Sequence, residues 1–149
     1  MTKDNNEVKI MQSIQAELKA PKGQTNKFGG YSYRSAEDIL EAVKPLLNKY
    51  DCYLTISDEI VEVGGRVYVK ATASLHESHR HLVADVTAYA REAEVKKGMD
   101  DAQITGSASS YARKYALNGL FAIDDTKDPD ATNKHGRENP KANFAKAEF

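Results

Sequence analysis

The sequence predicts an α+β domain in which helices cover one face of a three-stranded antiparallel β-meander. Three observations predict this fold: two stretches with helical spacing before residue 50, alternating strands between Cys52 and Arg91, and a long helical pattern after Gln103. The apolar face of a meander needs a cover, and the helices supply it. The expected order is therefore α-α-β-β-β-α.

Two amphipathic helices are expected in the first third of the chain. The first spans residues 6–19, and its apolar positions at helical spacing are Val8, Met11, Ile14 and Leu18. Ser35 is the expected N-cap of the second, with Asp38 three residues later in the capping-box position. This helix runs to about residue 49, and Pro45 should loosen the turn before it. Its core stripe consists of Ile39, Val43, Leu46 and Leu47.

The strands of the meander are marked by alternation. The first begins at Cys52, bends near Ser57 and ends before the two-residue hairpin signal Gly64-Gly65. The apolar face of the second strand consists of Val67, Val69, Ala71, Ala73 and Leu75. The apolar face of the third strand consists of Leu82, Ala84, Val86, Ala88 and Ala90. One face of the sheet is thus apolar and the other polar.

A charged loop over residues 92–101 leads to the last helix. Its apolar stripe consists of Ile104, Ala108, Tyr111, Ala112, Tyr115 and Leu120. Tyr111 and Tyr115 fall on this stripe, which favours a place in the core. The small residues from Gly106 to Ser110 are poor helix formers, so we expect another element or subunit to pack closely there.

Composition limits the classes of function. The 149 residues suffice for one domain, placed at residues 1–130, and residues 131–149 are polar, so we expect a disordered tail. The net charge of −1 neither favours nor excludes nucleic acid. The single Cys52 excludes an internal disulfide and is expected to be a buried strand thiol. Neither a signal peptide nor a membrane-length apolar run occurs, so we expect a cytoplasmic protein.

Motifs for nucleotide, metal or covalent chemistry are weak. The phosphate-binding P-loop pattern is absent, so ATP use is not expected, and no cofactor is predicted. Three histidines cluster at a strand turn, at positions 76, 79 and 81, without a completing ligand. Four aspartates between residues 124 and 130 resemble part of a calcium loop, but Pro129 replaces its required glycine. A metal-dependent nuclease using this cluster stays open as a weaker alternative.

Single-stranded nucleic acid needs cations for phosphates and flat side chains for bases. Several candidates lie in and after a polar, glycine-containing loop over residues 22–33. These are Lys27, Tyr31, Tyr33 and Arg34. Candidates on the meander and its following loop are Arg66, Lys70, Arg91, Lys96 and Lys97. The last helix adds Arg113 and Lys114, with Tyr111 or Tyr115.

Two motifs resemble the Erf family of phage recombination proteins, over about residues 5–130. The last helix carries Gly106-Ser107-Ala108, then Tyr111-Ala112-Arg113-Lys114-Tyr115, and ends in Leu120-Phe121, Ile123 and the aspartates. Upstream, a Tyr-Ser-Tyr segment at residues 31–33 precedes an acidic helix with Lys44-Pro45-Leu46-Leu47. In the light of this resemblance, Pro45 within a helix is a family trait.

The resemblance implies a single-strand annealing protein with a β-β-β-α core. Such proteins pair complementary DNA strands without ATP and assemble into rings or helical filaments. It implies a positively charged groove between the meander and the long helix, with Arg113 and Lys114 as phosphate contacts and Arg66 and Lys70 as further ones. It also implies a bacterial host cytoplasm, and as partners a host single-strand-binding protein and a phage exonuclease. Many members of the family contact the single-strand-binding protein through a longer C-terminal extension. Because this chain ends at Phe149, we expect that contact to be missing or the sequence to be shortened.

One competing class remains besides the nuclease. A non-catalytic RNA-binding or regulatory module could use the same α+β scaffold and the same surface cations. The sequence does not separate these classes, and a strand-annealing assay without ATP or metal would do so.

Overall fold

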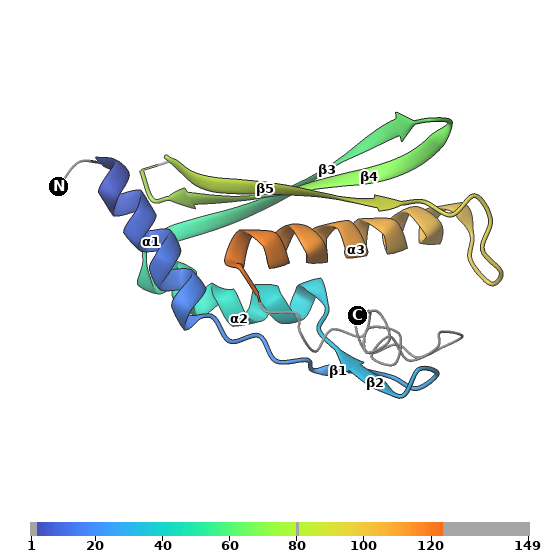
Figure 1. Ribbon diagram of the computed structural model, residues 1–149, viewed down its shortest axis with the longest axis horizontal. Coiled ribbons are helices and arrows are strands. Elements are labelled where there is room, and N and C mark those ends of the chain that lie inside the picture. Colours follow the sequence, from blue (N-terminus) through green and yellow to red (C-terminus); the bar gives the residue numbers. More distant parts are fainter. Residues whose placement is uncertain (1–2, 80, 124–149) are drawn as a thin grey trace, which may run out of the picture.

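A three-stranded antiparallel sheet forms one layer of the fold, and the helices lie on one side of it (Figure 1). The computed structural model describes residues 3–79 and 81–123. The helices are α1 (Lys3–Glu17), α2 (Ala36–Lys49) and α3 (Asp101–Phe121). The sheet consists of β3 (Cys52–Val63), β4 (Arg66–Glu77) and β5 (Leu82–Arg91) in sequential order. The predicted α+β class and element order are confirmed.

The meander follows the predicted alternation, with two differences. β3 is continuous through Ser57, where a bend was expected, because every residue of β3 pairs with one of β4. The register between β4 and β5 shifts after Leu75, leaving Val83 as an extra residue. Leu82 is therefore 48% exposed, against expectation, while Val83 packs against the core.

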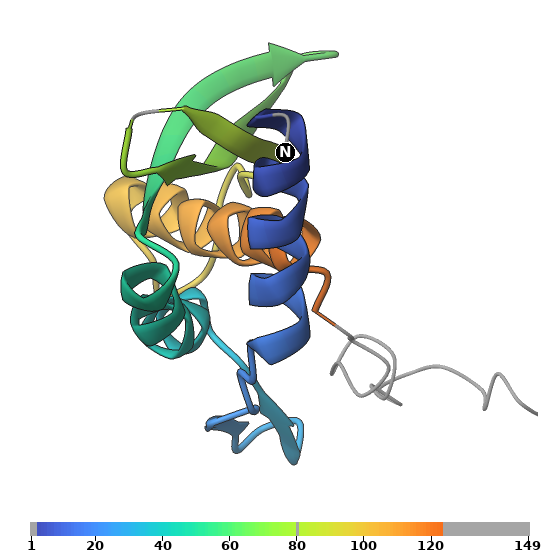
Figure 2. The ribbon, with the colours of Figure 1, turned by 90° about the vertical axis from the view of Figure 1, so that its left-hand side faces the viewer.

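α3 lies along the apolar face of the sheet, against β4 and β5 (Figure 2). The contact is built largely from alanine. Ala71 and Ala73 of β4 and Ala112 and Ala116 of α3 are all fully buried. Methyl side chains leave little between the two backbones, so the helix can approach the sheet closely. Asp100 caps the helix through a capping box with Gln103, so α3 starts slightly earlier than predicted.

The other two helices close the remaining side of the core. Ile14 of α1 and Ile39 and Val43 of α2 are fully buried, whereas Val8 of the predicted first stripe is 54% exposed. The amide of Gln15 donates to the carbonyl of Leu120 over 3.0 Å, which ties α1 to the end of α3. α2 continues through Pro45 without interruption.

The predicted capping box at the start of α2 is confirmed. Ser35 Oγ accepts from the backbone N–H of Asp38, whose carboxylate accepts from the N–H of Ser35 over 2.8 Å. This backbone hydrogen bond is the main reason why the pKa of Asp38 lies below its ordinary value of 3.8. The cap therefore stabilises the fold above that value, and the stabilisation is lost as the pH falls through the lowered pKa.

The expected loop between α1 and α2 contains a short antiparallel hairpin, β1 (Gln24–Asn26) and β2 (Tyr31–Tyr33). Three-residue strands carry too little periodicity to be predicted from sequence. The hairpin lies below α3, on the side away from the sheet (Figures 1 and 2).

Cys52, predicted to be a buried strand thiol, is only partly buried at the start of β3. Desolvation raises the pKa of this thiol, with a smaller effect of Asp51. The proposed tail at residues 131–149 and the four aspartates lie outside the described residues. Within the described residues, no helix is long and apolar enough to cross a membrane.

Two glycines of α3 provide a test of how closely this helix packs. A Cβ at Gly119 would lie 2.9 Å from Cγ1 of Val86 in β5, whereas a Cβ at Gly106 would meet nothing within 4 Å. The predicted close packing at the small residues is therefore not seen within the protomer at Gly106, and the close approach is at Gly119.

We expect Gly106→Ala to stabilise the protein by about 0.5–1 kcal/mol, because alanine is the better helix former. Gly119→Ala should destabilise it by about 1–3 kcal/mol, because the stiff Val86 side chain must move. Urea unfolding of both variants measures this. An equal gain in stability for the two would contradict the described packing.

Candidate nucleic-acid interface

A pocket of about 280 Å³ separates the β1–β2 hairpin from α3. We call it the hairpin pocket, and it is lined by Asn26, Tyr31, Tyr33, Arg34, Ser35, Ala36, Glu37, Ser110, Tyr111, Lys114 and Tyr115. Four of these side chains are tyrosines and two are cations. The predicted candidates Tyr33, Arg34 and Lys114, which are far apart in sequence, thus meet at one site.

Both cations of the hairpin pocket are held in its walls. Arg34 is 8% exposed, and its Nε donates to the carbonyl of Ala20 over 2.9 Å. Lys114 is 7% exposed, and its Nζ lies 5.3 Å from the centre of the Tyr115 ring, a cation–π distance. Both cations are therefore largely buried in the pocket wall, each held by a protein partner.

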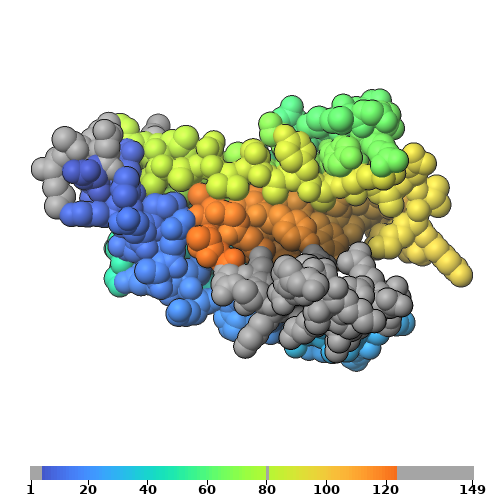
Figure 3. Space-filling model, viewed as in Figure 1, coloured from blue at the N-terminus to red at the C-terminus, as the bar shows by residue number. Residues whose placement is uncertain are grey.

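A second pocket, of about 310 Å³, lies on the other side of the same tyrosines, against the β5 edge of the sheet. We call it the β5 pocket, and it is lined by Tyr89, Ala90, Arg91, Ala93, Lys96, Met99, Ile104, Ser107, Ala108, Tyr111 and Tyr115. Figure 3 shows this side of α3 as a continuous strip of surface below β5. The predicted cation Lys96 belongs to this pocket.

Tyr111 and Tyr115 belong to both pockets. Their rings are stacked, with centroids 6.4 Å apart and an interplanar angle of 22°. Tyr111 is 55% exposed and Tyr115 is partly buried, so the prediction that Tyr111 lies in the core is wrong. The buried stripe of α3 is narrower than the sequence suggests. Opposite the middle of the helix the buried positions are Ala108, Ala112 and Ala116, and the tyrosines lie at the margin of this stripe.

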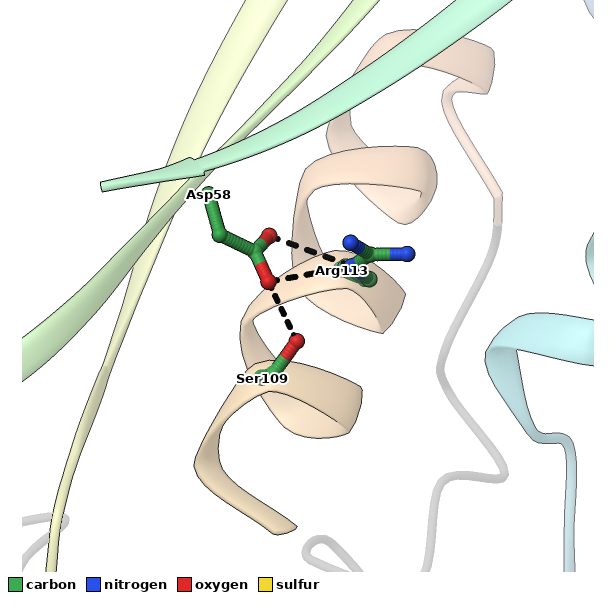
Figure 4. Close-up of polar contacts among 3 residues, drawn as sticks. All are labelled: Asp58, Ser109 and Arg113. Atoms are coloured by element: carbon green, nitrogen blue, oxygen red, sulfur yellow. Dashed lines mark hydrogen bonds and ion pairs between the residues drawn. The ribbon is translucent and has the colours of Figure 1, made fainter. Parts of the chain in front are cut away.

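Arg113 lies on the opposite flank of α3, toward β3 (Figure 4). Its Nε donates to Oδ1 of Asp58 over 3.1 Å, and Ser109 Oγ donates to Oδ2 of the same carboxylate over 2.5 Å. Arg113 and Lys114 are adjacent in sequence, yet a helix turns about 100° per residue and sends them to different sides. In this arrangement Asp58 already neutralises part of the Arg113 charge.

The remaining predicted cations are spread over several surfaces. Lys70 points to the polar face of the sheet, where its Nζ lies 3.9 Å from Glu59 and its cross-strand neighbour is Tyr89. Arg66 lines a separate hollow of about 250 Å³ together with Arg91 and three carboxylates. Lys27 and Lys97 are exposed on loops. Of the predicted cations, the β5 pocket between the meander and α3 therefore collects Arg91 and Lys96, and the hairpin pocket collects Arg34 and Lys114.

The histidine turn does not assemble a ligand set. His76 stacks on Tyr53 with ring centroids 4.7 Å apart, and His81 lies 3.9 Å from Glu77. Among residues 3–79 and 81–123, no group of three histidine, cysteine, aspartate or glutamate side chains could hold a metal ion.

The sequence reasoning overlooked two contributors to these pockets. Tyr89 is 54% exposed and lines the β5 pocket, and Asn26 lines the hairpin pocket. Tyr89 alternates with the partly buried Ala88 and Ala90 on β5, so its outward direction was predictable. Its approach to α3 across the strand edge depends on the tertiary structure.

The structure is that of an α+β protein with two aromatic, cation-bearing pockets along α3. A family model described as the ERF superfamily matches residues 8–148, so the chain belongs to this superfamily. No solved structure matches the chain.

A similar protein is the "Essential recombination function protein" of Salmonella phage P22. It is 59% identical over 125 residues, which is 84% of this chain. The match covers 58% of that relative's length, so this chain corresponds to little more than half of it.

The Arg113–Asp58 pair permits a test of how much Arg113 contributes to the stability of the fold. Both side chains are partly exposed, so a double-mutant cycle with Arg113→Ala and Asp58→Ala should give a coupling energy of about 0.2–1 kcal/mol. Urea unfolding at low and high salt measures this energy, which should shrink with salt. A coupling above about 2 kcal/mol would contradict a surface ion pair and assign Arg113 to the fold.

Proposed function

We propose that this protein binds single-stranded DNA and anneals complementary strands during phage recombination, without nucleotide hydrolysis. The observation that carries the proposal is the pair of pockets sharing Tyr111 and Tyr115, with cations in both, on a chain of the ERF superfamily. A relative at 59% identity bears the name of a recombination protein. Exposed tyrosines offer stacking surfaces, and nearby cations attract phosphates.

The strand would run along the exposed flank of α3, from the β5 pocket to the hairpin pocket. Lys96 lines the first pocket, and Lys114 and Arg34 line the second. The exposed Lys27 and Lys97 would contact phosphates beyond the two ends. Arg113, Arg66 and Lys70 lie off this line and would meet a second stretch of DNA or a neighbouring copy.

Each protomer offers room for only a few nucleotides, so annealing requires several protomers in a row. We propose a ring or helical filament that aligns these short sites into one continuous surface. The sheet leaves β3 and β5 as its two edge strands, and edge strands readily pair with another chain. Base pairing then supplies the free energy of annealing. We place this activity in the host cytoplasm, with a single-strand-binding protein and an exonuclease as partners.

An annealing assay with complementary oligonucleotides, in EDTA and without ATP, tests the proposal. The wild type should accelerate pairing, and activity in EDTA would exclude the metal-dependent nuclease. Arg113→Ala combined with Lys114→Ala should abolish annealing while the circular dichroism stays native. If the wild type does not accelerate pairing of DNA strands, or acts on RNA but not on DNA, the proposed function is wrong. If a folded double variant anneals DNA normally, only the assignment of Arg113 and Lys114 to the site is wrong.

Charge contacts are tested by the salt dependence of binding. Lys27→Ala and Lys96→Ala should each weaken binding to oligothymidylate and reduce the slope of log K against log salt by about 0.7, because one phosphate contact is lost. Lys44→Ala is the matched control, since Lys44 is an exposed lysine on α2 outside both pockets. If all three substitutions change the affinity and the salt slope equally, the DNA does not bind at these two pockets.

Asp58 offers a substitution that should increase affinity. If Arg113 contacts phosphate, Asp58→Asn removes its competing anion and should tighten binding several-fold at low salt. Fluorescence anisotropy with a labelled single strand measures this change. In the Arg113→Ala background, Asp58→Asn should increase the affinity by a smaller factor. An equal increase in that background would mean that the substitution acts through the overall charge and not through Arg113.

A further inference from the structure

Phe28 is the most exposed large apolar side chain among the described residues, at 98% exposure, and it lies at the tip of the β1–β2 hairpin. Phe28 does not belong to the core cluster. Three further observations point to its role: a rigid turn, a carboxylate-free surrounding segment, and the neighbouring hairpin pocket.

The turn that carries Phe28 is held in one conformation. Asn26 Oδ1 accepts from the backbone N–H groups of Phe28 and Gly29, over 2.9 and 3.1 Å. The N–H of Gly30 donates to the Asn26 carbonyl over 2.9 Å, and Asn26 Nδ2 donates to the Tyr31 hydroxyl over 2.8 Å. Gly30 has a positive φ of 64°. The aromatic ring is thus presented by a preorganised backbone, which lowers the entropic cost of a contact.

Glycine is required beside Phe28 for a steric reason. A Cβ at Gly29 would lie 2.1 Å from the Tyr31 ring. Tyr31 therefore packs directly over the turn, and its ring makes an edge contact with Tyr33 at 6.3 Å between centroids. The hairpin is an ordered aromatic unit from its tip to the pocket wall.

The charge of the hairpin segment itself favours an anionic partner, although Glu37 lines the pocket and the Asp38 carboxylate accepts from Gln24. Residues 18–36 contain four basic side chains and no acidic one, although the whole chain has a net charge of −1. The basic residues are Lys19, Lys22, Lys27 and Arg34. A segment of this sign, with interleaved aromatics, suits a polyanion with flat bases better than an apolar protein surface.

The position of Phe28 continues the proposed binding surface. Asn26, Tyr31 and Tyr33 line the hairpin pocket opposite Tyr111 and Tyr115. Phe28 is two residues beyond Asn26, in the turn that closes the hairpin. The turn thus joins two residues of the pocket lining, Asn26 and Tyr31, and places Phe28 between them in sequence.

We propose that Phe28 stacks on a base of the bound single strand just beyond the hairpin pocket, with Lys27 on the adjoining phosphate. This inference rests on the proposed function and adds to it a specific aromatic contact outside the α3 flank. Because bases of all kinds present a π-face, the contact tolerates any sequence, as annealing requires.

The chain contains no tryptophan, so Phe28→Trp introduces a single indole reporter. Titration of the full chain with a 20-nucleotide oligothymidylate should quench its fluorescence, and high salt should restore it. Binding of the oligonucleotide, seen by anisotropy, with unchanged indole fluorescence would overturn the inference.

Substitutions then separate stacking from other contacts. Phe28→Ala and Phe28→Leu should both weaken oligothymidylate binding roughly five- to hundredfold, the range for one lost base stack, whereas Phe28→Tyr should retain it. Val8→Ala, which alters an exposed apolar residue of α1 away from both pockets, should bind like the wild type.

The outcomes distinguish the two proposals. Wild type that fails to bind any single strand overturns the proposed function itself. Wild type that binds while Phe28→Ala binds equally overturns only the Phe28 contact. Full retention of binding by Phe28→Leu would assign an apolar contact rather than stacking. A changed oligomeric state of DNA-free Phe28→Ala, measured by light scattering, would assign Phe28 to a contact between copies and also overturn the inference.

Discussion

The close packing of α3 on the meander is the constraint on which the rest of the structure depends. Fully buried alanines of α3 and β4 face each other, and Gly119 leaves room for Val86. Larger side chains here would push α3 away from the sheet and increase its distance from β3 and β5. With the helix seated this low, its tyrosines come to the β5 edge and Arg113 comes within hydrogen-bonding distance of Asp58.

The candidate interface follows from the division of α3 into faces. One face is buried on the sheet, one carries Tyr111 and Tyr115, and one carries Arg113. The tyrosines are shared by two pockets, so a ligand that stacks on them can extend in both directions. The β1–β2 hairpin forms one wall of the hairpin pocket and is fixed by its own hydrogen bonds, including that from the amide of Gln24 to Asp38 over 3.3 Å. Asp38 thus both caps α2 through Ser35 and holds the hairpin through Gln24.

The cations of the candidate interface belong to a chain whose net charge is −1. Lys114 and Arg34 are held inside pocket walls, while the exposed lysines lie on loops at the ends. Asp58 moderates Arg113, and Glu59 lies near Lys70. On the proposed function, such a surface would make weak, salt-sensitive contacts with a DNA strand. This balance is consistent with the annealing role proposed for the chain, in which tight binding would oppose product release.

The sequence by itself determined the element order, the alternation of β4 and the capping box at Ser35, because these depend on local periodicity and short-range hydrogen bonds. It also identified most of the cations that reach the pockets. Only the tertiary structure decided which of them meet. Tyr111 fits the apolar stripe of α3 by its spacing. The part of α3 that is buried against the sheet is narrow, however, so Tyr111 lies at its edge and is exposed. Arg113 and Lys114 are neighbours in sequence, yet the helical turn directs them to opposite flanks. The hairpin that presents Phe28 has strands too short for any periodicity, and its order comes from the side chain of Asn26 and the packing of Tyr31.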